Sequence, residues 1–104
     1  MSVDIRLYSL ILRASSEGYH DLVDRVLSRS AADHRPALLE CRDDSGATPL
    51  MKSARAGHHP TVQVLLRFGA SVSATSQLGN TSMHWACLGG FKPIVKCFFV
   101  LINS

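Results

Sequence analysis

The sequence predicts an all-α fold, a short α-solenoid made of stacked helix-turn-helix units. The first observation is a repeat, because Gly46 and Thr48 return as Gly79 and Thr81, 33 positions later. A fixed period of this length, with glycines and helix-start residues in phase, is typical of stacked repeats. The second observation is the chemistry of those helix starts. A threonine hydroxyl can cap a helix N-terminus, and Pro49 suits the first helical position.

The first part of the chain is expected to be a weaker copy of the same unit. Residues 4–16 carry a wide apolar stripe that predicts a helix, which Gly18 can end. Asp21 is expected to cap or open a second helix. This hairpin precedes the next unit by 39 positions rather than 33, and residues 28–40 are expected to absorb the difference as an extended loop or an additional short turn. Residues 4–40 are therefore interpreted as a degenerate capping repeat with a long loop.

The middle of the chain holds the complete unit, residues 41–73. Its first helix is expected to end at Gly57, and Pro60 begins a second helix that Gly69 ends. Residues 74–104 repeat this pattern but lack the final glycine, so they are interpreted as a truncated repeat. The whole chain, residues 1–104, is expected to be a single domain.

These residues carry a resemblance to the ankyrin repeat family, whose unit is a β-turn and two antiparallel helices and whose hallmark is Thr-Pro-Leu-His-x-Ala. Residues 48–54, TPLMKSA, match with Met51 in the histidine place, so this residue cannot make the histidine's hydrogen bonds. Residues 81–87, TSMHWAC, keep the histidine as His84, which the resemblance implies bonds the backbone of the turn. The match is specific over residues 41–99 and weak over the first unit.

The distribution of charge divides the chain into two parts. The net charge is +3, yet all acidic residues lie at or before Asp44, and the charged residues that follow are all basic. A basic surface can attract an acidic partner. Nucleic-acid binding, however, needs a clustered basic stripe, and scattered cations are typical of a solvated surface, so nucleic acid is an unlikely partner. No signal segment and no apolar run long enough to span a bilayer occurs, so we expect no membrane contact and a cytoplasmic protein, with the nucleus as the alternative.

The residues that could carry chemistry do not form a recognisable site. His84 and Cys87 are three residues apart and Cys97 lies on the next predicted helix, but no fourth zinc ligand is evident. No nucleophile turn and no phosphate-binding glycine loop occurs. We therefore expect no enzyme activity, no cofactor and no metal, and reduced structural thiols at these cysteines and Cys41.

The candidate partner-binding residues follow from the resemblance, because ankyrin partners usually meet the turn tips and the inner helix surface. Mapped by register, those positions are Arg42, Asp44, Ser45, Ala47, Lys52, Arg55, Ala56, Gln77, Leu78, Asn80, Trp85 and Leu88. Trp85 is either an interface anchor, to which Leu78 and Leu88 add apolar area, or a side chain that packs between repeats.

The expected function is that of a non-catalytic protein–protein interaction module whose partner the sequence does not identify. The alternative is a regulatory arm or fragment of a larger multidomain protein or enzyme, and a basic nucleic-acid-binding surface is the less likely third reading. The last helix adds one further expectation. Its apolar residues Phe98, Phe99, Leu101 and Ile102 lack a polar cap, which favours self-association through that end.

Overall fold

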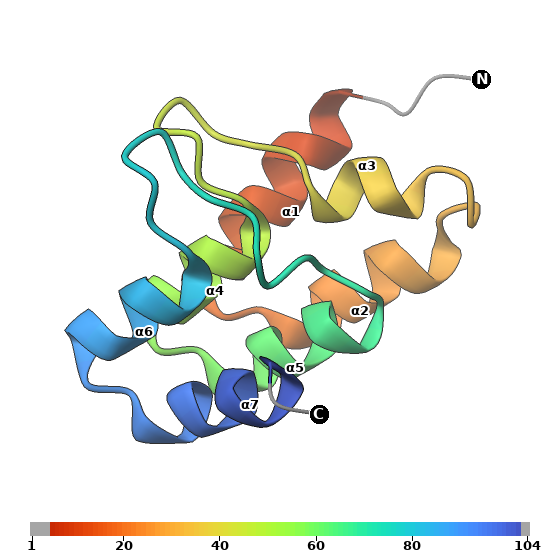
Figure 1. Ribbon diagram of the computed structural model, residues 1–104. Coiled ribbons are helices and arrows are strands. Elements are labelled where there is room, and N and C mark those ends of the chain that lie inside the picture. The colour runs from red at the N-terminus through yellow and green to blue at the C-terminus, as the bar shows by residue number, and fades with distance from the viewer. Residues whose placement is uncertain (1–4, 103–104) are drawn as a thin grey trace.

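The protein folds into two rows of stacked helices in the computed structural model, which describes residues 5–102 (Figure 1). The row that the long turns approach, here called the inner row, contains α1, α4 and α6, and the outer row contains α2, α5 and α7. All regular elements of this described part are helices, which confirms the predicted all-α solenoid. They are α1 (Ile5–Glu17), α2 (His20–Arg29), α3 (Arg35–Leu39), α4 (Pro49–Ala56), α5 (His59–Arg67), α6 (Ser82–Gly89) and α7 (Lys92–Ile102).

The inner helices of the last two units begin and end through the same chemistry. The Oγ1 atom of Thr48 accepts a hydrogen bond from the backbone N–H of Met51, and Thr81 Oγ1 accepts one from that of His84. Each hydroxyl therefore satisfies a donor that the first helical turn leaves without a partner. Gly57 ends α4 with a φ of 79° and Gly90 ends α6 with a φ of 71°, the left-handed conformation that glycine adopts without a steric cost.

Aromatic side-chain rings of one unit pack against glycines of the preceding unit and hold successive units in register. A Cβ atom at Gly18 would lie 2.6 Å from the ring of His58, and one at Gly57 would lie 2.5 Å from the ring of Phe91. His58 and Phe91 each follow the glycine that ends the inner helix of their own unit, so each reaches back to the equivalent glycine of the preceding unit. Around Gly90, in the last unit, such a Cβ atom would meet no side chain within 4 Å.

The first unit differs from the other two through α3. The segment 28–40 contains a five-residue helix rather than an extended loop, the additional short turn of the two expectations. Its side chains Leu38 and Leu39 are buried in the core, and Arg35 Nε donates a 2.8 Å hydrogen bond to the carbonyl oxygen of Leu27 at the end of α2. This contact satisfies one of the carbonyls that the end of a helix exposes.

One expectation at the helix ends needs correction, and another lies partly outside the described residues. Tyr19, not Asp21, precedes α2, and no side chain caps the helix; Asp21 lies in its first turn. The described part of α1 begins at Ile5, so position 4 of the predicted helix lies outside the described residues. None of the helices within residues 5–102 is both long and apolar enough to cross a bilayer.

The last helix leaves apolar side chains on the surface. Ile94 and Phe98 of α7 are buried, whereas Phe99 and Val100 are exposed. α7 contains 11 residues and α5 contains 9, since no glycine in α7 matches the one that follows α5. The side chains of Leu101 and Ile102 lie outside the described part, and self-association through this end stays a prediction.

Candidate functional site

A pocket of about 480 Å³ lies between the inner row and the two long turns. Three helices of successive units contribute to it, α1, α4 and α6, together with the turns before α4 and α6. We call it the inner-face pocket. It is lined by Ser16, Asp43, Ser45, Ala47, Met51, Lys52, Arg55, Ala56, Ser76, Gln77, Leu78 and Trp85.

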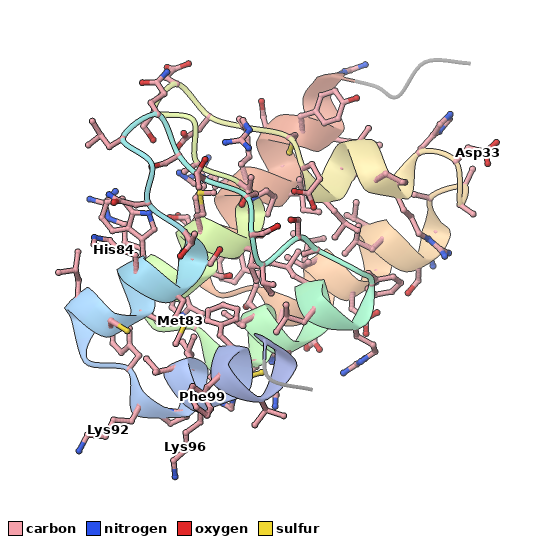
Figure 2. The ribbon with its side chains drawn as sticks, viewed as in Figure 1. Asp33, Met83, His84, Lys92, Lys96 and Phe99 are labelled. Atoms are coloured by element: carbon pink, nitrogen blue, oxygen red, sulfur yellow. The ribbon has the colours of Figure 1, made fainter. Side chains whose placement is uncertain are left out.

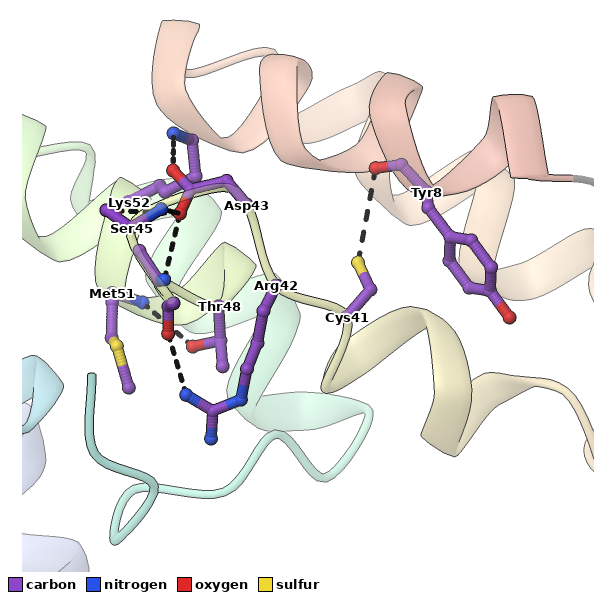
Figure 3. Close-up of polar contacts among 10 residues, drawn as sticks. Tyr8, Cys41, Arg42, Asp43, Ser45, Thr48, Met51 and Lys52 are labelled. Atoms are coloured by element: carbon purple, nitrogen blue, oxygen red, sulfur yellow. Dashed lines mark hydrogen bonds and ion pairs between the residues drawn. The ribbon is translucent and has the colours of Figure 1, made fainter. Parts of the chain in front are cut away.

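One wall of the pocket is organised by the carboxylate of Asp43 (Figure 3). Its Oδ1 atom accepts hydrogen bonds from the backbone N–H groups of Ser45 and Ala47, each at 2.9 Å, and from the hydroxyl of Ser45 at 2.7 Å. Its Oδ2 atom accepts a 2.8 Å hydrogen bond from Lys52 Nζ of α4. The turn is thereby tied to the helix that follows it, although Met51 occupies the place of the family histidine.

These contacts keep Asp43 ionised. Partial burial by itself would raise the pKa of this carboxyl, but the hydrogen bond from Lys52 and those from Ser45 and Ala47 lower it well below its ordinary value. The pair of Asp43 and Lys52 is also more shielded than a surface ion pair, since both side chains are about three-quarters buried (26% and 24% exposed). The two charges are therefore paired with each other, between the turn and the helix that follows it.

Another part of the lining pairs a cation with an indole ring. The guanidinium carbon of Arg55 in α4 lies 5.1 Å from the ring centroid of Trp85 in α6. This distance is within the range of a cation–π contact. Arg55 is exposed and has no carboxylate within ion-pair distance in the described part of the chain. Trp85 is half-buried, so it contacts the neighbouring unit and still lines the pocket.

The pocket brings together many of the predicted residues. It contains Ser45, Ala47, Lys52, Arg55, Ala56, Gln77, Leu78 and Trp85. Four predicted residues lie elsewhere. Arg42 reaches across the turns and donates to the carbonyl oxygens of Gly46 and Thr75, both at 2.6 Å. Its guanidinium therefore joins two successive turns.

The other three residues outside the pocket lie in the two turns or near the end of α6. Asp44 is exposed at the tip of its turn, and its carbonyl oxygen accepts a weak 3.5 Å hydrogen bond from Gln77. Asn80 closes its turn: its carbonyl oxygen accepts from the backbone N–H of Ser76, and its own N–H donates to the Ser76 hydroxyl. Leu88 is 68% exposed near the end of α6, where it occupies the register position that Arg55 has in the preceding unit.

Sequence reasoning missed four residues of the pocket. The sequence pattern marks Met51 only as the residue in the histidine place, and it does not single out Asp43. Ser76 lies beside the predicted Gln77. Ser16 could have been predicted from the register, because it precedes Arg55 by the same 39 positions that relate the first unit to the second.

The groups considered for metal binding or catalysis do not converge. Within residues 5–102, no three His, Cys, Asp or Glu side chains are grouped closely enough to hold a metal ion. The ring of His84 was expected to bond the turn backbone, but it projects from α6 and contacts Trp85 edge-on (Figure 2), and the backbone N–H of His84 donates to the side-chain hydroxyl of Thr81. Burial raises the pKa of the Cys41 thiol to about 11, and Cys87 is exposed.

The basic residues of the second part are spread over three helices. Lys52 and Arg55 lie on α4, Arg67 on α5, and Lys92 and Lys96 on α7, where the two lysines project away from the rest of the protein (Figure 2). Only the α4 pair lines the inner-face pocket. The described surface thus has no single row of these cations.

Comparisons with known proteins agree with this geometry. The family model described as "Ankyrin repeats (3 copies)" matches residues 10–102. The chain is 38% identical over 58 residues to the palmitoyltransferase AKR1 of Saccharomyces cerevisiae, 56% of this chain and 8% of that protein. It is 40% identical over 72 residues to the ankyrin repeat and KH domain-containing protein mask of Drosophila melanogaster, 69% of this chain and 2% of that protein.

A third relative is a probable E3 ubiquitin-protein ligase, XBOS33, of Oryza sativa, with 32% identity over 90 residues, 86% of this chain and 16% of that protein. The chain thus spans only a small part of the length of these relatives. With the family model covering most of its length, the chain belongs to the ankyrin repeat family.

Proposed function

We propose that this chain is a non-catalytic protein-interaction module that binds a partner through the inner-face pocket and the adjoining turn tips. Ankyrin repeats are protein-interaction modules. The observation that carries the proposal is the pocket itself, to which three successive units contribute and which combines a half-buried Trp85 with an 84% exposed Leu78. A large apolar side chain left in water beside a tryptophan is typical of an interface.

The chemistry of the pocket favours binding over catalysis. Its carboxylate, Asp43, accepts four hydrogen bonds, and its low pKa makes it a weak base. Lys52 is held against that carboxylate. None of the described residues that line the pocket is a histidine or a cysteine, so it offers a partner shape, apolar area and one exposed cation.

Site-specific photo-crosslinking tests the proposed surface. A photoreactive amino acid is placed at Gln77, which lines the pocket, or at Gln63, which is also exposed but lies on the outer helix α5. We expect a protein crosslinked at position 77 and not at position 63, and a yield that falls strongly with Trp85→Ala, since truncating an interface anchor typically costs about 2–4 kcal/mol of binding. Equal yields at both positions, or a yield unchanged by Trp85→Ala, would refute it.

A second candidate is a regulatory arm within a larger protein. It is favoured by relatives in which the matched segment is a small share of a palmitoyltransferase or a ubiquitin ligase. In that case the partner would be another domain of the same polypeptide. The test is the full coding sequence around residues 1–104: a further folded domain in the same reading frame supports the arm, and its absence removes it.

A further inference from the structure

The charges of the inner-face pocket are unequal, and this imbalance constrains what can bind there. Asp43 and Lys52 neutralise each other at 2.8 Å, and Asp43 is also bound by Ser45 and Ala47. Arg55 is the remaining charged side chain of the lining, and it has no carboxylate partner in the described part. The pocket therefore has one uncompensated positive charge.

No nearby segment of the second part can neutralise this charge, because every residue after Asp44 is neutral or basic. The guanidinium lies 5.1 Å from the centre of the Trp85 ring, which supports the arginine side chain from one side. A guanidinium held in this way keeps a planar set of donors that matches the two oxygens of a carboxylate.

Apolar side chains also line the pocket that holds this cation. Met51 is a buried residue of the lining, and Leu78 is 84% exposed on the turn before α6. Leu78 and Trp85 thus present apolar surface from the turn and from the helix that follows it. Removing such surface from water contributes about 25 cal/mol per Å², so an apolar side chain inserted here would add binding energy beside the charge.

We propose that the partner presents an acidic, apolar-anchored peptide segment, in which an aspartate or glutamate binds Arg55 while a neighbouring aliphatic or aromatic side chain enters the pocket against Leu78 and Trp85. This inference rests on the proposed function and names the chemistry of the partner. A nucleic acid is disfavoured as the occupant, because a phosphate backbone needs a track of cations and this pocket has a single uncommitted one.

Selection of peptides against the full chain tests the inference. A library of random peptides about ten residues long is displayed on phage and selected against the wild type, Arg55→Glu and Arg67→Glu. Arg67 is the matched control, since it is also an exposed arginine in the last turn of a helix, but on the outer row. We expect the wild type and Arg67→Glu to select an acidic residue next to a large apolar one, and Arg55→Glu to select a basic residue instead.

The affinity of one selected peptide gives the quantitative test. Changing its acidic residue to the amide should weaken binding to the wild type by about 10- to 100-fold, the range for a hydrogen bond to a charged group. The same change should have little effect on Arg55→Gln, which lacks the charge. Leu78→Ala should weaken binding of both peptides, because it removes apolar contact and leaves the charged contact. Trp85→Ala should also weaken both, because it removes the apolar contact and the ring that supports Arg55.

The outcomes separate this inference from the function on which it rests. Apolar peptides without an acidic residue that depend on Trp85, or an acidic preference that survives Arg55→Glu, overturn the inference and leave the interaction surface standing. Peptides that bind all these variants equally overturn both. Tighter binding of a labelled single-stranded RNA than of the peptide, lost in Arg55→Glu, would assign the cation to phosphate and also overturn the inference.

Discussion

The contact between Gly57 and Phe91 predicts that two equivalent glycines differ in their tolerance of alanine. Gly57 and Gly90 both end an inner helix in the left-handed conformation, with φ values of 79° and 71°. An alanine there costs about 1–2 kcal/mol for its backbone alone. At Gly57 the added Cβ would also lie 2.5 Å from the Phe91 ring, whereas at Gly90 it would meet nothing within 4 Å.

The difference between the two variants isolates the contact between units. Forcing a ring away from its packed position costs about 1–3 kcal/mol, as overpacking typically does. We therefore expect Gly57→Ala to lower the free energy of unfolding by about 2–5 kcal/mol and Gly90→Ala by about 1–2 kcal/mol. The gain from a stiffer unfolded chain is the same for both and cancels.

Urea unfolding followed by far-UV circular dichroism measures both variants. The double variant Gly57→Ala/Phe91→Ala is the control, because the smaller side chain leaves room for the new Cβ. Relative to Phe91→Ala, the added Gly57→Ala change should then cost no more than Gly90→Ala does. If Gly57→Ala destabilises the wild type no more than Gly90→Ala, the ring does not set the spacing of the units and the reasoning fails.

Two further predictions concern the pocket wall and the cysteines. Asp43→Asn should destabilise the protein by about 1–3 kcal/mol in urea unfolding. Because the folded pKa of Asp43 is lowered, its contribution is complete above about pH 4, the unfolded value, and is lost as pH falls, so the variant should show a smaller loss of stability on acidification. With iodoacetamide at mildly alkaline pH, the exposed Cys87 should be alkylated in the native protein, whereas Cys41, with a pKa of about 11, should react only after denaturation; early modification of Cys41 in mass spectra would contradict its burial.

The repeat period made most of the fold predictable. Local rules suffice for the helix starts at Thr48 and Thr81 and for the ends at Gly57 and Gly90, because a cap or a left-handed glycine depends on a few adjacent residues. The short helix α3 could not be specified, since five residues are too few to show a helical period. The burial of its two leucines depends on which part of the core the other helices of the first unit leave exposed, and this cannot be read from five residues.

The candidate site was predictable in position but not in its interactions. Register placed Lys52, Arg55 and Trp85 on the inner helices. Which charge each cation meets depends on distances between units, and so the ion pair of Lys52 with Asp43 and the stacking of Arg55 on Trp85 could not be read from spacing. The ring of His84 was expected at the turn backbone and instead lies against Trp85, which shows that the family pattern transfers position more reliably than role.

The surplus length of the first unit has a consequence for how this polypeptide can change. Ala31, Ala32 and Asp33 form an exposed turn between α2 and α3, where Asp33 projects from the edge of the protein (Figure 2). Lengthening a flexible surface loop costs little, roughly 0.6 kcal/mol for each doubling. Extra residues, or a genetically inserted reporter, can therefore be accommodated in this turn without changing how the helical hairpins stack on one another.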